Sequence, residues 1–513
     1  MVLTRLSVGG TEPGEEPLVA VIKLDFDRVI GTLDRRILGG FTEHLGRCIY
    51  GGVFDEGSAL SDQDGFRTDV VEVVRRLRPP LIRWPGGNFV SGYHWSDGIG
   101  PRAGRPRRME LAWHAEEPNT FGTDEFMRFC KLVGAEPYLC VNMGTGTLDE
   151  AQAWVEYCNG TGRTYWAQQR RSNGHEEPYN VRLWGLGNEM YGPWQIGALS
   201  AEDYVKRARE FAKVMTWADP GIELVSCGEF GWGEWDRVVL EGLAEHVRYH
   251  SLHLYTGSDD YWQNVLSPHQ AERALRITRA LIEQVRHAQR IKHPVHVAYD
   301  EWNVWFRERD GPAGLEERYT LADALAVATY LHAFVRNSDL VKVANQAQLV
   351  NVIAPIVTSP EGLFLQSIYH PLRLFADHLG SLALDVFVSS PRHELVEEDD
   401  ATPWPYRVAD LGPFSVLDAV ATYEPEGGKV TLSVVNRDPS SEVTAEISLA
   451  QPLEPQAALV EEVNGASVSA SNSFEAPEEV FVTQGEIEQF RDGVSYTFPA
   501  HSMTVITFGY VPG

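Results

Sequence analysis

The chain has 513 residues, which is too long for one ordinary hydrophobic core and predicts two or more domains. Its 43% hydrophobic and 23% charged residues are typical of a soluble globular protein and exclude a disordered or fibrous one. With 44 basic against 72 acidic residues the net charge is −28, which disfavours nucleic acid and anionic membranes as partners and favours a neutral ligand.

The start of the chain and its cysteines indicate the compartment. Residues 1–16 are rich in Gly, Pro and Glu and predict a mobile leader, without the basic start and apolar run of a signal peptide. No apolar stretch approaches the roughly 20 residues of a membrane helix. The five cysteines are odd in number and never form a Cys-x-x-Cys pair, which indicates reduced thiols. We therefore expect a cytoplasmic protein.

From residue 37 to about residue 380, short apolar runs alternate with helical patterns. The expected strands cover residues 37–43, 81–84, 137–142, 179–185, 223–226, 249–254, 295–299 and 340–345. The expected helices cover residues 66–77, 124–132, 149–157, 201–217, 235–243, 269–289 and 321–336. Eight alternations predict a (β/α)₈ TIM barrel over residues 37–380. A doubly wound open sheet is the alternative, but it usually has fewer strands, and no glycine-rich phosphate loop appears.

Beyond residue 380 the helical patterns stop. Residues 431–436, 443–449 and 503–508 read as strands separated by Pro, Gly, Asp and Ser clusters. They predict a C-terminal all-β sandwich (jelly-roll-like) over residues 381–513. An early strand at 19–26, within an N-terminal segment of residues 17–36, is expected to join it.

Polar residues recur where the predicted barrel strands end, and the C-terminal ends of the strands are where the chemistry of such barrels takes place. The ends of five strands carry Glu43 and His44, then Arg83 and Asn88, then Asn142, then Asn188 and Glu189, and then Asp300 and Glu301. The sixth strand adds His253 and Tyr255. Core packing alone would not place polar groups at one end of so many strands, so we expect a site there.

Two carboxylates, Glu189 and Glu301, follow the fourth and seventh strands, whose ends face each other across the barrel mouth. Such a pair suits glycoside hydrolysis, in which one carboxyl donates a proton and the other attacks the sugar or stabilises its positive charge. A separation of about 5 Å would predict a retaining mechanism through a covalent intermediate. A lone Glu is more often salt-bridged or solvated, but two at facing strand ends are harder to explain that way.

Side-chain alternation makes two local predictions. Glu301 follows Val295, Val297 and Tyr299 at a period of two, so a regular strand points all four into the barrel. Asn188 and Glu189 are adjacent, so one regular strand cannot point both inward. We expect that strand to end or bulge there, which Gly185 and Gly187 would ease.

Seven stretches carry a family resemblance. They cover residues 39–47 (GGFTEHLGR), 83–95 (RWPGGNFVSGYHW), 111–114 (LAWH), 117–126 (EPNTFGTDEF), 187–190 (GNEM), 300–305 (DEWNVW) and 500–505 (AHSMTV). Together, and in this order, they resemble the α-L-arabinofuranosidases of glycoside hydrolase family 51. Asn-Glu alone is a weak signal, because many barrel glycosidases share it, whereas the whole set spans nearly the entire chain.

The resemblance implies roles for single residues. Glu189 would be the general acid/base and Glu301 the nucleophile, with Arg83 keeping Glu301 ionised. Trp113 would cover the bound sugar and Trp302 would pack beside it. The remaining contacts to the furanose ring would come from Glu43, Asn88, Asn188, Tyr255 and Gln366. The resemblance also implies a homo-oligomer, commonly a hexamer.

Three rivals are weaker. A metal-dependent hydrolase could use His44, His250, His253, His293 or His296, but no His-x-His pair stands at a strand end, so neither a metal nor a cofactor is expected. A non-catalytic carbohydrate-binding protein would tolerate the loss of Glu301. An endo-β-1,4-glucanase or xylanase would need an open cleft, whereas the loop around Trp113 indicates a closed pocket.

The sequence therefore predicts a retaining exo-α-L-arabinofuranosidase. Its expected substrates are small arabino-oligosaccharides and arabinose-substituted xylan fragments, because a cytoplasmic enzyme would meet imported oligomers and not intact cell wall.

Overall fold

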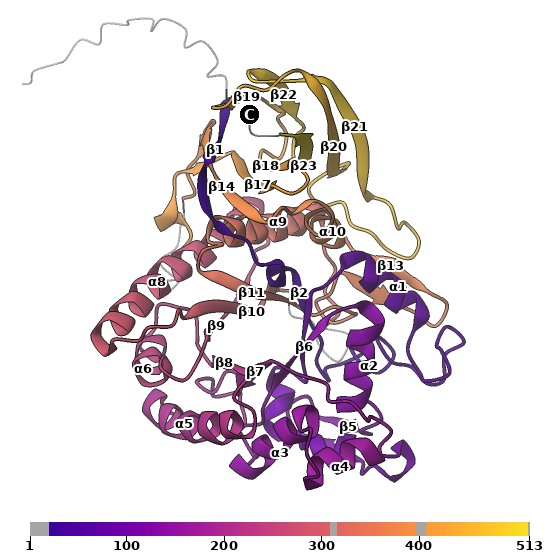
Figure 1. Cartoon of the computed structure of the whole chain (residues 1–513). Helices are drawn as coiled ribbons and strands as arrows, with labels where there is room; N and C mark the ends of the chain where they lie inside the picture. Colours follow the sequence, from indigo (N-terminus) through magenta and orange to yellow (C-terminus); the bar gives the residue numbers. More distant parts are fainter. Residues whose placement is uncertain (1–19, 308–314, 397–406, 511–513) are drawn as a thin grey trace, which may run out of the picture.

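The computed structural model describes residues 20–307, 315–396 and 407–510, which form a barrel joined to a second, all-β body (Figure 1). The predicted leader of residues 1–16 lies outside the described ranges.

Eight parallel strands close into a barrel in the order β10-β11-β2-β3-β6-β7-β8-β9. They are β2 (Gly39–Phe41), β3 (Leu81–Trp84), β6 (Glu136–Cys140), β7 (Leu183–Leu186), β8 (Glu223–Ser226), β9 (Tyr249–Thr256), β10 (His296–Val304) and β11 (Val341–Ala347). Each falls on one of the eight predicted strands, so the TIM barrel is confirmed.

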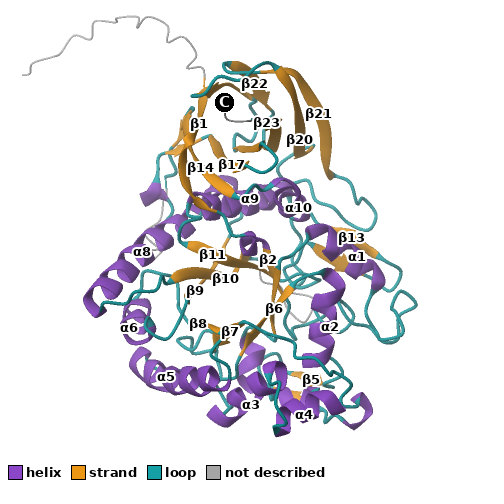
Figure 2. Cartoon of the chain, viewed as in Figure 1, coloured by secondary structure: helices purple, strands orange, loops and turns teal. Residues whose placement is uncertain are grey.

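Helices surround this barrel (Figure 2). The predicted ones are α1 (Thr68–Leu77), α2 (Thr123–Val133), α3 (Leu148–Asn159), α5 (Ala201–Ala218), α6 (Glu234–Leu243), α8 (His269–Gln289) and α9 (Leu321–Arg336). Three further helices were not predicted: α4 (Tyr165–Ser172), α7 (Tyr261–Leu266) and α10 (Tyr369–His378). The hydroxyl of Ser200 accepts a hydrogen bond from the backbone of Asp203 and so begins α5 as a side-chain cap.

The inside and the outside of the barrel have different packing. Seven strands each contribute one buried side chain to an inner layer, made of Leu81, Tyr138, Leu183, Val225, Tyr249, Ala298 and Val343. The opposite faces of the same strands pack against the helices in the main core of the protein. Because a filled interior leaves no pore, a ligand can reach only the mouth.

Long loops rise over the C-terminal ends of the barrel strands. Between β3 and α2 the chain forms three short 3-10 helices, η2 (Asn88–Gly92), η3 (Trp95–Gly98) and η4 (Arg102–Gly104), and a hairpin of β4 (Arg108–Glu110) and β5 (Ala115–Glu117). A second hairpin, β12 (Ile356–Thr358) and β13 (Leu363–Leu365), follows β11. Trp113 lies at the turn of the first hairpin.

The all-β body is one nine-stranded sheet in the order β21-β20-β23-β18-β17-β14-β1-β19-β22. Its strands are β1 (Ala20–Thr32), β14 (Leu382–Ser389), β17 (Leu417–Glu424), β18 (Lys429–Asn436), β19 (Val443–Leu449), β20 (Gln456–Gly465), β21 (Val480–Phe490), β22 (Val494–Phe498) and β23 (Ser502–Gly509). Phe490 and Phe498, from strands at opposite ends of this order, share one apolar cluster, so the sheet folds over its own core. β1 pairs with β14 and β19, so the early strand does join the C-terminal sheet.

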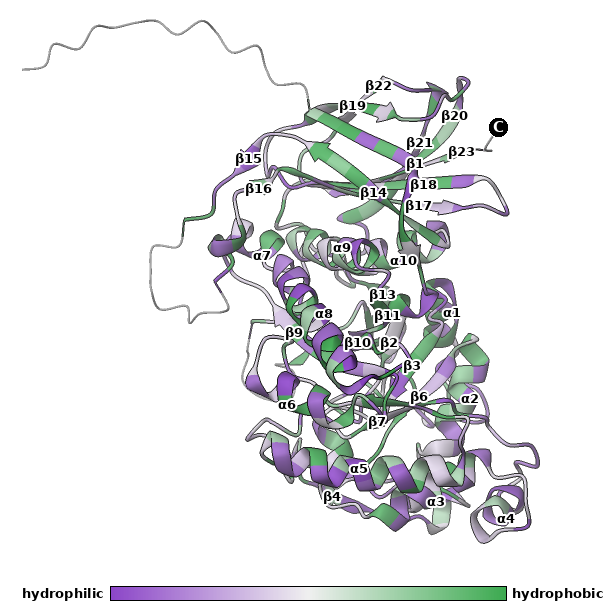
Figure 3. Ribbon diagram, turned by 60° about the vertical axis from the view of Figure 1, so that its left-hand side comes forward, coloured by the Kyte–Doolittle hydropathy of each residue, from purple (hydrophilic) through white to green (hydrophobic). Residues whose placement is uncertain are grey.

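Helix α9 lies between the barrel and the sheet (Figure 3). All of its residues from Leu321 to Val335 are buried, as expected for a helix that is covered on every side. Its one histidine, His332, is held at 2.9 Å from Asp418 and from Ser433, both on sheet strands. The apolar helix and this polar bridge join the two bodies.

Across the described ranges, every helix is too short or too polar to span a bilayer. All five cysteines are buried free thiols.

Candidate active site

The mouth of the barrel brings together polar side chains from six of its eight strands. They are Glu43, Arg83, Asn188, Glu189, His253, Tyr255, Asp300, Glu301 and Gln348. All of them except Gln348 were recognised in the sequence as polar residues at strand ends.

The two predicted carboxylates lie next to each other. One oxygen of Glu189, one of Glu301 and a ring nitrogen of His253 all lie within 4.8 Å of one another. Nδ1 of His253 is 3.0 Å from Oε1 of Glu189 and 3.5 Å from Oε2 of Glu301. This spacing matches the roughly 5–5.5 Å between the carboxyl groups of retaining glycosidases and is well below the roughly 6.5–9.5 Å of inverting ones.

The backbone after β7 places Glu189. The strand ends at Leu186, and Gly187 and Glu189 then adopt positive φ angles of 79° and 42°. This left-handed turn points the side chains of the adjacent Asn188 and Glu189 into the mouth, as predicted from the glycines before them. A glutamate with positive φ is uncommon and costs backbone strain, which is typical of functional sites.

Two aromatic side chains orient the Glu189 carboxylate. Nε1 of Trp194 donates to Oε2 at 2.6 Å, and the hydroxyl of Tyr191 donates to Oε1 at 3.2 Å. Trp194 is 53% exposed, so one of the two donors to Glu189 is itself in contact with solvent. Neither residue was singled out in the sequence, although both lie within five positions of Glu189.

Glu301 is held by two charge-stabilising donors. Nη1 of Arg83 donates to Oε2 at 2.7 Å, and the hydroxyl of Tyr255 donates to Oε1 at 2.7 Å. Nη2 of Arg83 also donates to Asn188 at 2.5 Å, so one guanidinium connects the strands that carry both carboxylates. These two bonds fix the orientation of the Glu301 carboxylate in the mouth.

The predicted regular alternation along β10 is wrong. Ala298, and not Tyr299, belongs to the inner layer, while the Tyr299 ring packs against Phe334 of α9 on the outside. The pairing of β10 with β9 shifts by one residue between Ala298 and Glu301, which is the mark of a β-bulge. The extra residue resets the alternation, so both Asp300 and Glu301 reach the mouth.

Asp300 is a buried anchor that the sequence did not assign. It accepts hydrogen bonds from the hydroxyls of Tyr138, at 2.6 Å, and Ser251, and it lies 3.3 Å from Nε2 of His253. Arg83 lies 3.6 Å away. These contacts hold the pKa of Asp300 below its usual value although burial opposes this. Its place directly before Glu301 was the only sequence signal.

The charges of the site shift the pKa values of His253 and Glu189 in opposite directions. Burial would lower the pKa of His253, but the negative charges of Glu301, Asp300 and Glu189 raise it to about 10. Burial would raise the pKa of Glu189, but its hydrogen bond to His253 and the charge of that ring lower it. These opposite shifts place the proton that the two groups share on His253 and not on Glu189.

Glu43 lines the other side of the mouth. It accepts from the backbone of Phe89 at 3.1 Å, from Nε1 of Trp113 at 3.0 Å and from Gln348 at 3.1 Å. Burial and the charge of Glu301 raise the pKa of Glu43 to about 8, so this carboxyl is largely neutral at pH 7. A Cβ at Gly87 would lie 2.4 Å from its Oε2, so a larger residue there would displace the carboxyl group.

Two predicted sugar contacts lie elsewhere. The Gln366 amide donates to the carbonyls of Glu317 and Ala354 and accepts from the backbone of Tyr319, so it supports loops behind the mouth. Trp302 is 1% exposed and packs on the rings of α9, because the residue after an inward Glu301 points outward.

Gln348 is brought to the mouth instead. It stands directly after β11, and the signal that could have found it was its place just beyond the eighth strand. Of the other predicted contacts, Trp113 is half-buried above Glu43, and Asn88 is half-buried at the start of η2, directly before Phe89.

The histidines considered as metal ligands have other partners. His44 pairs with Glu117 at 2.9 Å, His250 with Asp236 at 3.0 Å, and His293 with backbone carbonyls. Within the described ranges, one set of three potential ligand side chains converges, and it is the Glu189, His253 and Glu301 cluster.

Comparisons with known proteins agree over nearly the whole chain. Residues 73–273 match the family model of the α-L-arabinofuranosidase 1 domain, and residues 300–502 that of the α-L-arabinofuranosidase C-terminal domain. A probable α-L-arabinofuranosidase C of Aspergillus clavatus is 43% identical over 96% of this chain and 97% of its own length. An intracellular exo-α-(1→5)-L-arabinofuranosidase of Halalkalibacterium halodurans is 41% identical over 82% of this chain and 85% of its own. The structure of the GH51 α-L-arabinofuranosidase of Thermotoga petrophila matches with a TM-score of 0.88 and 41% identity, covering 95% of this chain and 100% of that one.

Proposed function

Since this chain belongs to the α-L-arabinofuranosidases of glycoside hydrolase family 51 and is an exo-acting enzyme of that activity, we propose that Glu301 and Glu189 carry out its double displacement. The observation that carries the proposal is the facing pair of carboxylates within 4.8 Å at the barrel mouth. It supports retention of configuration at the anomeric carbon.

Glu301 takes the part of the nucleophile. Arg83 and Tyr255 direct its carboxylate, each through a 2.7 Å hydrogen bond. One oxygen of Glu301 attacks the anomeric carbon as the bond from that carbon to the glycosidic oxygen breaks. The product of this step is an arabinofuranosyl ester of Glu301.

Glu189 takes the part of the acid and then of the base. It gives a proton to the departing oxygen and later removes one from the water that hydrolyses the ester. That proton comes from His253, whose Nδ1 lies 3.0 Å from Oε1 of Glu189. Transfer of this proton from Nδ1 of His253 to Oε1 of Glu189 leaves a neutral imidazole that faces Asp300. Glu189 is then protonated and can act as the acid of the first step.

The furanose ring fits between this pair and Glu43. Glu43, largely neutral, can both donate to and accept from sugar hydroxyls, and Trp113 lies over it. Asn88, Asn188 and Tyr255 complete the proposed contacts, with Gln348 in the place first given to Gln366. A hairpin that places Trp113 on Glu43 suits a site for one terminal sugar, which agrees with exo action.

A panel of nitrophenyl glycosides tests the assignment of the sugar. We expect release from the α-L-arabinofuranoside, with kcat/KM at least about 100-fold above those for the β-D-xyloside and β-D-glucoside, because a site built to bond one set of hydroxyls rejects others. Matched rates on all three would contradict the proposal. Reduced arabino-oligosaccharides, cleaved one residue at a time, would confirm exo action.

Gln348 and Gln366 offer a matched pair of substitutions. We expect Gln348→Ala to lower kcat/KM by about 10- to 100-fold, because its amide donates to Glu43. Gln366→Ala should instead lower Tm, since three buried backbone groups lose their partner, while KM of the folded enzyme stays within about twofold. The reverse pattern would return the sugar contact to Gln366.

The substrates proposed are arabino-oligosaccharides and arabinose-substituted xylan fragments, in the cytoplasm. The relative named an intracellular exo-α-(1→5)-L-arabinofuranosidase supports both, and the five free thiols agree with the location. We also propose a homo-oligomer, a hexamer by family resemblance. Light scattering on the purified protein measures it, and a monomer at micromolar concentration would exclude it.

A further inference from the structure

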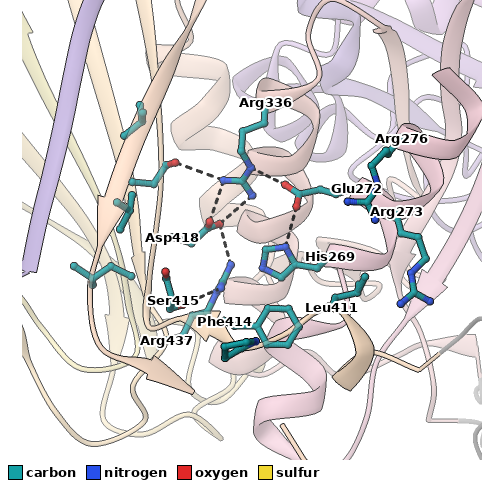
Figure 4. Close-up of a pocket in the computed structure, with 15 residues that line it drawn as sticks. His269, Glu272, Arg273, Arg276, Arg336, Leu411, Phe414, Ser415, Asp418 and Arg437 are labelled. Atoms are coloured by element: carbon teal, nitrogen blue, oxygen red, sulfur yellow. Dashed lines mark hydrogen bonds and ion pairs between the residues drawn. The ribbon is translucent and has the colours of Figure 1, made fainter. Parts of the chain in front are cut away.

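The cavity of about 360 Å³ where the barrel meets the sheet is a structural joint (Figure 4). Arg336 pairs with Glu272 at 2.6 Å and with Asp418 at 2.9 Å, and so joins α8, α9 and β17. Arg437 lies 3.0 Å from the same Asp418. Because these charges bind one another, the joint connects the two bodies. A surface open to a ligand lies elsewhere, on the loop after β7.

Trp194, on the loop between β7 and α5, is open to solvent. Among the tryptophans of the described ranges, Trp194 and Trp217 are the two exposed ones, by 53% and 77%. Trp217 lies near the end of α5, on the outside of the barrel. Trp194 instead adjoins the catalytic carboxylates, because its Nε1 donates to Oε2 of Glu189 at 2.6 Å. The chain therefore leaves a large aromatic ring uncovered next to the group proposed as the acid.

The neighbouring residues fix the Trp194 ring. A Cβ on Gly192 would lie 2.3 Å from Cε2 and 2.5 Å from Cζ2 of the indole, so the ring packs against the Gly192 backbone. The Tyr191 ring stands at 90° to the indole, with the two ring centroids 6.0 Å apart. One side of the indole thus lies against the backbone, and its N–H is bound to Glu189. The side away from Gly192 is the one that meets solvent.

The indole lies on the side of Glu189 from which a leaving group departs. Nδ1 of His253 is 3.0 Å from Oε1 of Glu189 and 3.5 Å from Glu301, so Oε1 faces the nucleophile, whereas Trp194 binds the other oxygen. In a double displacement the leaving oxygen moves away from the nucleophile and stays within hydrogen-bond reach of the acid, roughly 2.6–3.2 Å. The group that this oxygen carries therefore lies beside the Trp194 ring.

The exposed side of the indole suits a neutral sugar ring. Such a ring carries C–H groups on its faces and hydroxyl groups at its rim. An aromatic side chain can cover the apolar face while the hydroxyl groups stay in water. The arabinose and xylose units of the proposed substrates are leaving groups of this class.

We propose that Trp194 forms the subsite for the leaving group, where one face of a pentose ring stacks on the indole. The inference rests on the proposed role of Glu189 as the acid and extends it to the part of the substrate that Glu189 protonates. Trp194 then has two separable functions. Its N–H orients the Glu189 carboxylate, and its ring binds the sugar that departs.

Two substrates with the same arabinofuranosyl group measure this subsite. Methyl α-L-arabinofuranoside releases methanol, and α-(1→5)-arabinobiose releases a sugar. Both leaving groups are alkyl alcohols that need a proton from the acid. The measured quantity is kcat/KM for arabinobiose divided by kcat/KM for the methyl furanoside. Because the first sugar and its protonation are common to both substrates, this ratio reports the contacts of the leaving sugar.

Three variants separate the ring of Trp194 from its N–H. Trp194→Ala removes both and should lower the ratio about tenfold. Trp194→Phe keeps an aromatic ring but loses the N–H, so both kcat/KM values should fall together and the ratio should stay within about twofold of the wild type. Trp217→Ala, which removes the other exposed indole, should match the wild type on both substrates.

The proposal is overturned if Trp194→Ala leaves the ratio within about twofold of the wild type, since Trp194 would then act only through Glu189. It is equally overturned if Trp194→Phe lowers the ratio as much as Trp194→Ala does, because the aromatic ring would then not be what binds the sugar. A wrong assignment of Glu189 would appear differently, as equal losses of Glu189→Ala on good and poor leaving groups, and would not change this ratio.

Discussion

Replacing Glu301 with alanine is expected to lower kcat on the order of 10⁴-fold or more for every arabinofuranoside, whatever its leaving group. The reason is that Glu301 forms the bond to the anomeric carbon, so no choice of aglycone can compensate for its loss. Steady-state kinetics on an activated aryl substrate and on an arabino-oligosaccharide measure the effect.

Azide distinguishes loss of the nucleophile from loss of the fold. In Glu301→Ala, azide can occupy the space of the missing carboxylate and attack from that side, giving an arabinofuranosyl azide of inverted configuration. Glu234→Ala is the control, because this exposed carboxylate at the start of α6 forms its ion pair among the described residues with Arg237 in the same helix. We expect the control to match the wild type. A loss of activity confined to substrates with poor leaving groups would show that Glu301 is not the nucleophile.

Replacing Glu189 with alanine should have an effect that depends on the leaving group. With dinitrophenolate, which departs without a proton, kcat/KM should change by less than about tenfold, whereas with an alkyl or sugar leaving group it should fall about 10²- to 10⁴-fold. The second step also loses its base, so the glycosyl-enzyme accumulates, and both kcat and KM fall on the activated substrate.

Azide again separates the two carboxylates. In Glu189→Ala it attacks the glycosyl-enzyme from the side left open by the missing acid/base, which restores kcat on the activated substrate and gives an azide of retained configuration. Retained product from one variant and inverted product from the other would fix both assignments. An equal fall in kcat/KM for substrates with good and with poor leaving groups would exclude Glu189 as the acid/base.

The barrel was predictable because its signal is repeated. Eight apolar runs alternate with helical patterns, and an error at one boundary does not change the count. The facing carboxylates were predictable for a related reason, since polar groups at the end of a buried strand have no place in a packed core. The helices α4, α7 and α10 escaped prediction because they are short and lie between other elements, where the periodic signal is weak.

The finer parts of the site were not predictable, because they depend on departures from regularity. Tyr299 reads as an inward residue of β10, and nothing in its neighbours reveals the bulge that turns it outward. Gln348 and Gln366 both follow the eighth strand, and only the fold shows which one faces Glu43. The sequence indicates His253 only as a possible metal ligand. Its role beside three carboxylates is not visible there, because they come from distant parts of the sequence.

The position of β1 constrains the order in which this chain can fold. The strand is made first, yet it lies inside the C-terminal sheet between β14 and β19, and the backbone of Phe26 bonds to Gln451, 425 residues further on. A ribosome has released the whole barrel before the partners of β1 exist. Closing such a distant pairing is intrinsically slow, and the edge of β1 stays exposed meanwhile. Strand β1 can therefore find its place in the sheet only after β14 and β19 have been made.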